Sequence, residues 1–229
     1  MSTIMEYKEG GPMQSDLTDL YAKSPETKNL TEKQMKVFNA SIRLFSLKGY
    51  ANTSTKEIAD FAEVSEGSIF KHFTNKHGLL NAILKPLIDS LLPDVLHEFS
   101  RKTLLTSYPS LQEFVNTIIK DRIQFIKKNI LVVKIFLSEI LYDSSIRNDL
   151  FKAFPKEFIE DLNNEISQMK ERKILVDWPN DQIVRFLAAN LAGYVVQHYI
   201  YFPKQQWDED AEVEHLIDFI VKGLTPDKS

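Results

Sequence analysis

Apolar residues recur at helical spacing through most of this chain, and the pattern predicts an all-α protein. From Thr31 onward, Met35, Phe38, Ile42 and Phe45 follow at intervals of three or four residues, which places them on one face of a helix. Polar residues or prolines separate similar patterns further along the chain. We expect these further helices near residues 54–62, 68–73, 76–92, 94–105, 110–128, 130–152, 155–173, 179–202 and 209–223, with 130–152 forming either one bent helix or two.

Residues that cap helices support the first boundaries. Thr31 precedes Gln34 by three residues, and Ser54 precedes Glu57 in the same way, which is the spacing of a capping box. Gly49 suits the left-handed position that ends a helix. We therefore predict that one helix begins after Thr31 and another after Ser54.

The helix over 76–92 is expected to follow Asn75, another N-cap residue, and it contains a proline. Pro86 lacks an amide N–H, and its ring crowds the preceding helical turn. We expect Pro86 to bend this helix. The residues on its inward face are Leu79, Leu80, Ile83, Leu84, Leu87 and Ile88.

Polarity divides the chain into three parts. Residues 1–27 are polar, contain Gly10-Gly11-Pro12 and show little periodicity, so we expect a mobile N-terminal arm. Residues 28–75 hold three short helical patterns and are expected to form one domain. Residues 76–229 are expected to form a larger helical domain.

Residues 54–73 have the pattern of a helix-turn-helix. Such a unit joins two short helices by a tight turn and needs apolar residues that lock the pair onto a supporting helix. The residues expected to form this lock are Ile58, Ala59, Phe61, Val64, Ile69 and Phe73. Ser65 can cap the second helix, and Gly67 keeps its first turn slim enough to enter a DNA major groove. The alternative is that residues 31–85 form only the corner of a helical bundle.

Charge is unevenly distributed along the chain, and the distribution favours contact with a polyanion. Residues 28–85 contain nine Lys/Arg and five Asp/Glu. The counts are two against five in residues 1–27 and 17 against 22 in residues 86–229. A basic module in a chain of net charge −4 is what local binding to nucleic acid would produce, although a chance fluctuation would give the same counts.

Composition argues against several other classes of protein. The chain has no cysteine, which excludes disulfides, thiolate metal sites and a cysteine nucleophile. No apolar run reaches the roughly 18–20 residues of a membrane helix, and the first residues lack the apolar segment of a signal peptide. We expect a cytoplasmic protein without a membrane partner. The five histidines lack metal-ligand spacing, and no phosphate-binding glycine loop or nucleophile elbow is found, so we expect no enzyme, no cofactor and no metal.

Over about residues 31–85, roughly a quarter of its length, the chain resembles the tetracycline-repressor (TetR) family of bacterial regulators. The matching stretches are Phe45-x3-Gly49-Tyr50, Thr55-x2-Ile58-Ala59, Val64-Ser65-x-Gly67-Ser68-Ile69 and Phe70-x-His72-Phe73-x2-Lys76-x2-Leu79-Leu80. Many spaced positions match at once. The resemblance implies an N-terminal three-helix helix-turn-helix domain for DNA binding, residues 28–75, and a C-terminal helical domain for ligand binding and dimerisation, residues 76–229.

The resemblance also implies which residues contact DNA. The residues that match phosphate-binding positions are Thr53, Ser54, Thr55 and Lys76. Those that match groove-facing positions are Ser65, Glu66, Gly67 and Ser68, and those beside base edges or phosphate are Lys71 and His72. Physical chemistry agrees, because helix N-termini and lysines both attract phosphate.

Two of the implied DNA contacts are unusual. The family commonly has tyrosine at the position of Phe70, and its hydroxyl reaches a phosphate. Phe70 keeps the ring but loses a hydrogen bond worth roughly 1–2 kcal/mol. Glu66 is awkward beside phosphates and is expected either to accept from a cytosine amine or to remain a solvent-exposed turn residue.

A homodimer is implied through the last two long helices, over residues 181–201 and 209–224. The expected interface residues on their apolar stripes are Ile183, Phe186, Leu187, Asn190, Leu191, Tyr194, Leu216, Ile217 and Ile220. For each of them, burial in the internal core is the alternative. A dimer would place two recognition helices one DNA turn, roughly 34 Å, apart.

A ligand pocket is expected among the C-terminal helices. The candidate ligand contacts are Phe125, Phe136, Glu139, Ile140, Tyr142, Phe158, Gln197 and His198. Ordinary core packing is the alternative for each. A mainly apolar lining favours a lipophilic or aromatic effector.

These features predict a sequence-specific DNA-binding transcriptional regulator, a repressor that a small ligand releases from a palindromic operator. Release requires the ligand to prefer a conformer whose two recognition helices no longer match the operator. The alternative is a ligand-independent DNA-binding structural or cell-division factor on the same scaffold.

Overall fold

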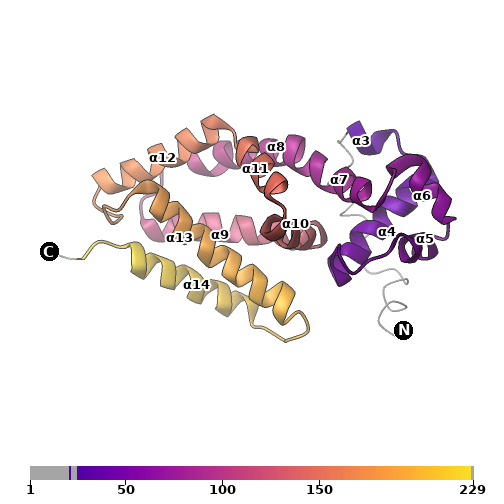
Figure 1. The fold of residues 1–229 in the computed structure, drawn as a ribbon. Coiled ribbons are helices and arrows are strands. Elements are labelled where there is room, and N and C mark those ends of the chain that lie inside the picture. The colour runs from indigo at the N-terminus through magenta and orange to yellow at the C-terminus, as the bar shows by residue number, and fades with distance from the viewer. Residues whose placement is uncertain (1–20, 22–24, 228–229) are drawn as a thin grey trace. The chain divides into compact units, whose positions relative to one another are not determined.

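A computed structural model of the chain describes Tyr21 and residues 25–227, and every regular element within these residues is helical (Figure 1). This confirms the predicted all-α class. The residues divide into two compact units. Unit 1 consists of Met1–Pro93 and Lys128–Ala153, and unit 2 consists of Asp94–Lys127 and Phe154–Ser229. None of the described helices is both long enough and apolar enough to cross a membrane.

Unit 1 contains the short N-terminal helices and two helices from the middle of the chain. Its elements are α3 (Pro25–Lys28), α4 (Glu32–Lys48), α5 (Thr55–Ala62), α6 (Glu66–Phe73), α7 (Lys76–Pro86), a π-helical turn (Leu87–Leu91), α10 (Ile130–Tyr142) and α11 (Ser144–Ala153). Both predicted capping boxes are present, at the starts of α4 and α5. The Asn75 side chain accepts from the Gly78 N–H and caps α7. Gly49 ends α4 with a φ of 82°.

The core of unit 1 is built around α4. Phe38, Ile42 and Phe45 are almost completely buried there, and apolar residues of α5, α6 and α7 close over them. Helix α10 contributes Val132 and Ile135 to the same core, each with 1% of its surface exposed. The predicted domain boundary after residue 75 therefore does not coincide with a compact unit, because α7 and α10 bury apolar side chains in the core around α4.

Residues 1–20 and 22–24 of the predicted N-terminal arm lie outside the described residues. The described part corrects the expectation of mobility, since Tyr21 is only 2% exposed. Its hydroxyl donates to the Ile83 carbonyl at 2.8 Å, and its ring meets Phe38 edge-on with centroids 5.1 Å apart. Burial raises the pKa of Tyr21 far above its usual range. Tyr21 is thus part of the core of unit 1.

Unit 2 consists of longer helices. Its elements are most of α8 (Leu92–Phe99), a π-helical turn (Ser100–Leu104), α9 (Leu111–Lys128, of which Lys128 belongs to unit 1), α12 (Lys156–Glu171), α13 (Asn180–Val195), a second π-helical stretch (Val196–Tyr201) and α14 (Glu209–Leu224). Its buried residues include Phe114, Ile119, Ile166, Met169 and Ile183. Figure 1 shows α13 and α14 running side by side as an antiparallel pair, and the two helices are in contact.

One predicted helix break is absent, and the alternative left open for residues 130–152 is decided. From Lys76 to Leu104 the helical elements follow one another without a break, so the predicted interruption near residue 93 is wrong. Pro86, which has no N–H to donate to the preceding turn, ends α7 and is followed directly by the π-helical turn. The segment 130–152 forms two helices, because Asp143 stops α10 and its carboxylate accepts from the N–H groups of Ser145 and Ile146.

Candidate nucleic-acid interface

Helices α5 and α6 form the predicted helix-turn-helix. Ile58, Ala59, Ile69 and Phe73 are buried against the rest of unit 1, and Phe61 and Val64 are half-buried. In the turn, Glu63 adopts a left-handed φ of 57°, which lets the Val64 N–H donate to the Ala59 carbonyl at 3.0 Å. The predicted lock residues therefore hold α6 by one face and leave its other face to solvent.

The outward face of α6 carries most of the residues predicted to contact DNA. The exposed ones are Ser65, Glu66, Gly67, Phe70, Lys71 and His72, and Ser68 is half-buried. Phe70 is 46% exposed, although it is a large apolar side chain. The structure thus brings the groove-facing candidates together on one surface.

The N-terminal end of α6 is open. The Ser65 hydroxyl does not cap the helix as expected; it lies 2.9 Å from the Ser68 hydroxyl. First-turn N–H groups of a helix lack partners within the helix. The Ser68 N–H donates to the Ser65 carbonyl at 2.9 Å, so the N–H groups of Glu66 and Gly67 are the ones available to an incoming acceptor. Gly67 adds no bulk there, since a Cβ built on it would meet no atom within 4 Å.

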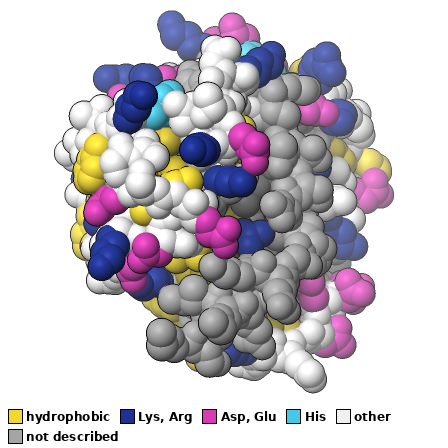
Figure 2. Space-filling model, turned by 90° about the vertical axis from the view of Figure 1, so that its right-hand side faces the viewer, with side chains coloured by type: hydrophobic (Ala, Val, Ile, Leu, Met, Phe, Trp, Pro, Cys, Tyr) yellow, Lys and Arg dark blue, Asp and Glu magenta, His cyan; other side chains and the backbone are white. Residues whose placement is uncertain are grey.

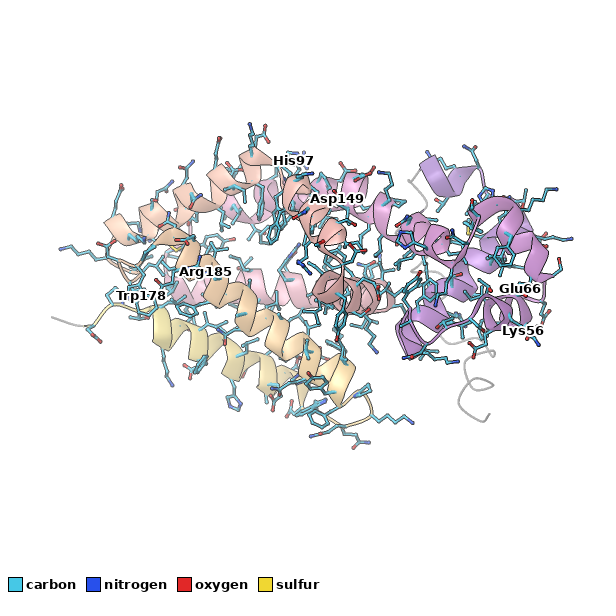
Figure 3. All side chains as sticks on the ribbon, viewed as in Figure 1. Lys56, Glu66, His97, Asp149, Trp178 and Arg185 are labelled. Atoms are coloured by element: carbon cyan, nitrogen blue, oxygen red, sulfur yellow. The ribbon has the colours of Figure 1, made fainter. Side chains whose placement is uncertain are left out.

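The N-terminal ends of α5 and α6 are tied to each other. Thr55 at the start of α5 donates its hydroxyl to the Glu66 carboxylate at 2.5 Å. Figure 3 shows the Glu66 side chain and that of Lys56, the second residue of α5, on the outer side of these helices. The Thr55 hydroxyl, predicted to meet phosphate, therefore also fixes Glu66.

The capping box of α5 is held by a charged side chain. Glu57 accepts from the Ser54 N–H at 2.9 Å and also pairs with Lys48. The hydrogen bond from Lys48, together with that from the Ser54 backbone, lowers the pKa of Glu57 to about 2. Glu57 therefore stays ionised at neutral pH, and the Ser54 hydroxyl already has a partner in Glu57.

Thr53 does not lie where the resemblance implied. It is 1% exposed, and its hydroxyl donates to the Gly49 carbonyl at 2.9 Å. This corrects the expected phosphate contact, because the hydroxyl is directed into the loop between α4 and α5. A threonine in a loop before a helix gives no sequence signal that separates these two orientations.

Lys76 also has partners within the protein. Its ammonium lies 2.9 Å from each of the carbonyl oxygens of Tyr50 and Thr53 and 3.4 Å from that of Ala51. It also lies 4.4 Å from the centroid of the Tyr50 ring. The predicted phosphate-binding lysine is therefore engaged with the loop that precedes α5.

Two other lysines on these helices carry positive charge that is not used within the described part of the protein. Lys71 on α6 and Lys56 on α5 are exposed, and neither has an ion-pair partner among the described residues. Sequence reasoning singled out Lys71 but missed Lys56, whose only signal is its place in the first turn of α5. Figure 2 views the molecule from the side of these helices and shows Lys and Arg side chains interspersed with Asp and Glu.

A tight turn connects α6 to α7. Thr74 has a φ of 66°, and the Asn75 N–H donates to the Phe73 carbonyl at 2.7 Å. The same carbonyl oxygen lies 1.8 Å from the place where a Cβ on Gly78 would be. Only glycine therefore fits at residue 78 without moving this turn.

The residues predicted for the dimer interface divide by burial. Four of them are at most 7% exposed within a single chain and therefore pack in the core of unit 2, which was the alternative to an interface role. These four are Ile183, Tyr194, Ile217 and Ile220. The same two helices carry four half-buried members of this set, which are Leu187, Asn190, Leu191 and Leu216. On the outside of these helices, Phe186 is 43% and Phe219 67% exposed.

The residues predicted to bind a ligand divide between the two units. Tyr142 is 89% exposed, which does not fit a pocket residue within unit 1. Phe136 packs against the core around α4, and Glu139 and Ile140 are half-buried. In unit 2, Phe158 lies between Phe99 and Phe154, Phe125 is half-buried and Gln197 is exposed.

His198 is the buried polar residue of this predicted set. Its Nδ1 lies 2.9 Å from the Tyr194 carbonyl, and its ring packs against Trp207 with centroids 4.4 Å apart. Because a carbonyl can only accept, Nδ1 carries the proton. The Nε2 atom is buried without a hydrogen-bond partner among the described residues, 3.9 Å from the Glu212 carboxylate.

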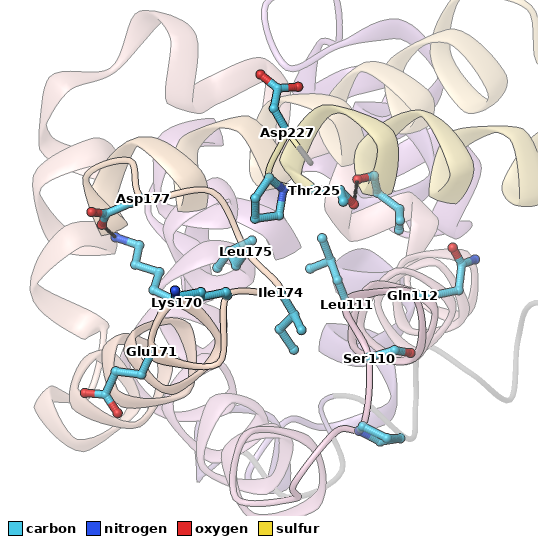
Figure 4. Close-up of a pocket in the computed structure, with 14 residues that line it drawn as sticks. Ser110, Leu111, Gln112, Lys170, Glu171, Ile174, Leu175, Asp177, Thr225 and Asp227 are labelled. Atoms are coloured by element: carbon cyan, nitrogen blue, oxygen red, sulfur yellow. Dashed lines mark hydrogen bonds and ion pairs between the residues drawn. The ribbon is translucent and has the colours of Figure 1, made fainter. Parts of the chain in front are cut away.

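Unit 2 also has a groove of about 1210 Å³, which sequence reasoning did not predict. It lies between the start of α9, the end of α12 with the loop after it, and the end of α14 (Figure 4). Leu111, Ile174 and Leu175 give it an apolar side, and Lys170, Glu171 and Asp177 lie on its rim. None of the predicted ligand contacts lines it.

Comparison with known proteins agrees with this geometry. Residues 37–83, which span most of α4 and all of α5 and α6, match the family described as bacterial regulatory proteins, tetR family. The uncharacterized HTH-type transcriptional regulator YvkB of Bacillus subtilis is 24% identical to the chain, with 84% of this chain and 97% of YvkB covered. The nucleoid occlusion factor SlmA of Actinobacillus pleuropneumoniae is also 24% identical, with 79% and 91% covered.

The fold extends the likeness beyond the helix-turn-helix. The crystal structure of the transcriptional regulator FadR of Bacillus subtilis in complex with stearoyl-CoA matches with a TM-score of 0.56 at 15% identity, covering 82% of this chain and 98% of that one. Unit 1 presents the exposed outward face of α6, and its residues 37–83 match the family model. The chain is therefore a helix-turn-helix transcriptional regulator, and its residues 37–83 match the tetR family of bacterial regulatory proteins.

Proposed function

We propose that this regulator is a repressor that inserts the N-terminal end of α6 into the major groove of a palindromic operator and leaves it when a small ligand binds. One observation carries the DNA-binding geometry. The first turn of α6 is exposed and uncapped, carries Gly67, and is held from behind by the buried Ile69 and Phe73. A slim, rigid helix end with free N–H groups fits between phosphate ridges. The compartment we propose for it is the cytoplasm.

The proposed base-reading surface consists of the exposed side chains of α6. Ser65, Ser68 and His72 can each donate to or accept from base edges, and Lys71 can donate to guanine or to phosphate. Glu66 keeps one carboxylate oxygen free of Thr55, so it can accept from a cytosine amine. Phe70 offers only an apolar contact, such as one with a thymine methyl group.

The proposed phosphate contacts flank this surface. Helix α5 starts at an exposed capping box, and the N–H groups of its first turn that the box leaves unused can receive a phosphate oxygen. Lys56 supplies a charge at the same helix end, and Lys71 supplies one on α6. These positions replace Thr53, whose hydroxyl is buried.

The proposed partner at α13 and α14 is a second copy of this chain. Phe186 and Phe219 are large apolar side chains that lie outside the core of unit 2. Burial of such side chains favours association by about 1.5–3 kcal/mol each when it is complete. Leu187, Asn190, Leu191 and Leu216 retain exposed surface on the same helices and can complete the interface.

The proposed effector is lipophilic or aromatic and carries a hydrogen-bond donor. The buried Nε2 of His198 is an acceptor without a partner among the described residues, and leaving such an atom unpaired costs about 1–3 kcal/mol. A ligand donor that reaches Nε2 would recover part of this cost. We expect His198→Phe, which keeps ring packing against Trp207, to abolish release by lipophilic amines or alcohols while operator affinity stays unchanged.

A second candidate function is that of a DNA-binding structural factor, which the similarity to SlmA favours. Genome-wide mapping of the bound protein separates the two functions. A regulator occupies a few sites next to promoters, and transcription from them changes when its gene is deleted. Many dispersed sites without such transcriptional changes would support the structural factor instead.

A further inference from the structure

Lys76 is the first residue of α7, and its ammonium group is surrounded by backbone. The carbonyl oxygens of Tyr50 and Thr53 lie at 2.9 Å, and that of Ala51 lies at 3.4 Å. A lysine ammonium has three N–H donors and no acceptor. All three donors therefore have a carbonyl partner within the protein, and the Tyr50 ring lies 4.4 Å from the same nitrogen.

The three carbonyls belong to the loop that leads from α4 into α5. This loop starts at Gly49 and ends at Ser54, the N-cap residue of α5. Thr53 closes it from inside by donating its hydroxyl to the Gly49 carbonyl at 2.9 Å. The Lys76 ammonium donates to three carbonyls of this loop. Lys76 therefore connects the start of α7 to the start of α5.

The start of α5 is in turn connected to the recognition helix. Thr55, next to the N-cap, donates to Glu66 in the first turn of α6 at 2.5 Å. A shift of the loop would move Ser54 and Thr55, and with them Glu66. The position of the Lys76 ammonium therefore affects both helix ends that are proposed to face DNA.

We propose that Lys76 is a positioning residue: it fixes the N-terminal end of α5 against α7 and does not bind a phosphate itself. The inference rests on the proposed DNA-binding function. Binding a phosphate oxygen would require the ammonium to release at least one of its carbonyls, because its three donors are all in use. Lys56 and Lys71, which have no ion-pair partner among the described residues, supply the phosphate contacts.

The salt dependence of operator affinity distinguishes a phosphate contact from a positioning residue. Each phosphate contact adds about 0.9 to the slope of log K against log salt concentration. We expect Lys56→Met and Lys71→Met each to reduce the magnitude of this slope by about 0.9 for every phosphate contact that the substitution removes. Lys76→Met should weaken binding by about the same factor at every salt concentration and leave the slope unchanged. A slope reduced as in the two control variants would overturn the inference.

Lys76→Arg gives a second, independent outcome. Arginine keeps the charge and binds phosphate well, but its planar guanidinium cannot aim three donors at carbonyls gathered around one point. A phosphate contact would therefore survive this substitution, whereas a positioning residue would not. We expect Lys76→Arg to weaken operator binding about as much as Lys76→Met does, and retention of the full affinity would contradict the proposal.

Amide hydrogen exchange in the absence of DNA tests the positioning role without relying on DNA binding. In Lys76→Met, the Thr53 and Glu57 amides, which bond to Tyr50 and to the Ser54 hydroxyl, should exchange at least about tenfold faster. The buried amides of α4 should keep their rates, which shows that the variant is folded. Unchanged rates at Thr53 and Glu57 would refute the inference, while failure of the wild type to bind any duplex would refute only the proposed function.

Discussion

Two glycines in the helix-turn-helix region illustrate opposite demands on a single residue. Gly67 lies at the exposed first turn of α6, where a Cβ would meet nothing within 4 Å. Gly78 lies in the first turn of α7, where a Cβ would come within 1.8 Å of the Phe73 carbonyl oxygen. The fold requires the second glycine and not the first. If Gly67 has a role, that role concerns what approaches α6 from outside.

Gly67→Ala should therefore separate stability from DNA binding. We expect the protein to become more stable by up to about 1 kcal/mol, because alanine favours a helix over glycine. Operator affinity should fall about tenfold, which corresponds to about 1.4 kcal/mol, since the methyl group lies where the backbone approaches the groove. Urea unfolding and fluorescence anisotropy measure the two effects. Unchanged affinity would mean that this turn does not come close to DNA.

Gly78→Ala is the matched substitution with the opposite expectation. The new methyl group must displace the backbone of the turn around Thr74, at a cost of about 1–3 kcal/mol. Urea unfolding should show this loss as a lower midpoint with an unchanged slope. A stability equal to that of the wild type would show that the turn yields easily and does not fix α6 against α7.

Sequence patterns predicted the role of a residue correctly where that role depends only on residues close to it in the chain. The capping pairs Thr31–Gln34 and Ser54–Glu57 are both formed, because such a motif needs only residues three apart. The partners of Lys76 lie 23 to 26 residues earlier in the chain, and no local pattern shows that these carbonyls converge. The burial of Thr53 and Tyr21 was missed for the same reason.

At the scale of elements, α10 belongs with the DNA-binding helices. Its sequence is apolar on nearly every side, with only Lys134, Ser138 and Glu139 as clearly polar residues. Periodicity therefore predicted a helix but did not indicate which face it buries. The structure shows that Val132 and Ile135 are the residues that complete the core around α4.

Ile135→Ala tests the place of α10 in this core. Ile135 is 1% exposed, and truncation of a buried isoleucine to alanine costs about 2–5 kcal/mol. We expect urea unfolding to show a loss in this range, together with faster amide exchange in α4. Ile159→Ala on α12 is the control, because Ile159 is 42% exposed and its truncation should cost less than about 0.5 kcal/mol. Equal effects of the two substitutions would place α10 outside the core.

At the scale of the whole molecule, the proposed dimer depends on apolar side chains that remain exposed after both cores are built. Sequence patterns predicted apolar stripes on α13 and α14 but could not divide each stripe between core and surface. The structure makes this division: Ile183 and Ile217 face inward, while Phe186 and Phe219 remain exposed. A repressor that reads a palindrome needs two recognition helices, and hence two copies of the chain.

Phe219→Asp should therefore produce a folded monomer. Phe219 is 67% exposed, so the fold loses little, whereas a carboxylate in an apolar interface is strongly unfavourable. Sedimentation velocity should show half the wild-type mass, and operator affinity should fall with it. Phe151→Asp on α11 is the matched control at a phenylalanine that is 70% exposed. If both variants keep the wild-type mass, the α13–α14 surface is not the dimer interface.

Selection of DNA from a pool of random duplexes by the wild-type protein, at low and at moderate salt, tests the central claim most directly. A recognition helix that reads base edges will enrich a palindrome whose half-sites are about one helical turn apart. Gly67→Ala, with its fold intact, should enrich that sequence less. If the wild type retains no duplex, or retains all sequences equally, α6 does not read DNA and the account is wrong.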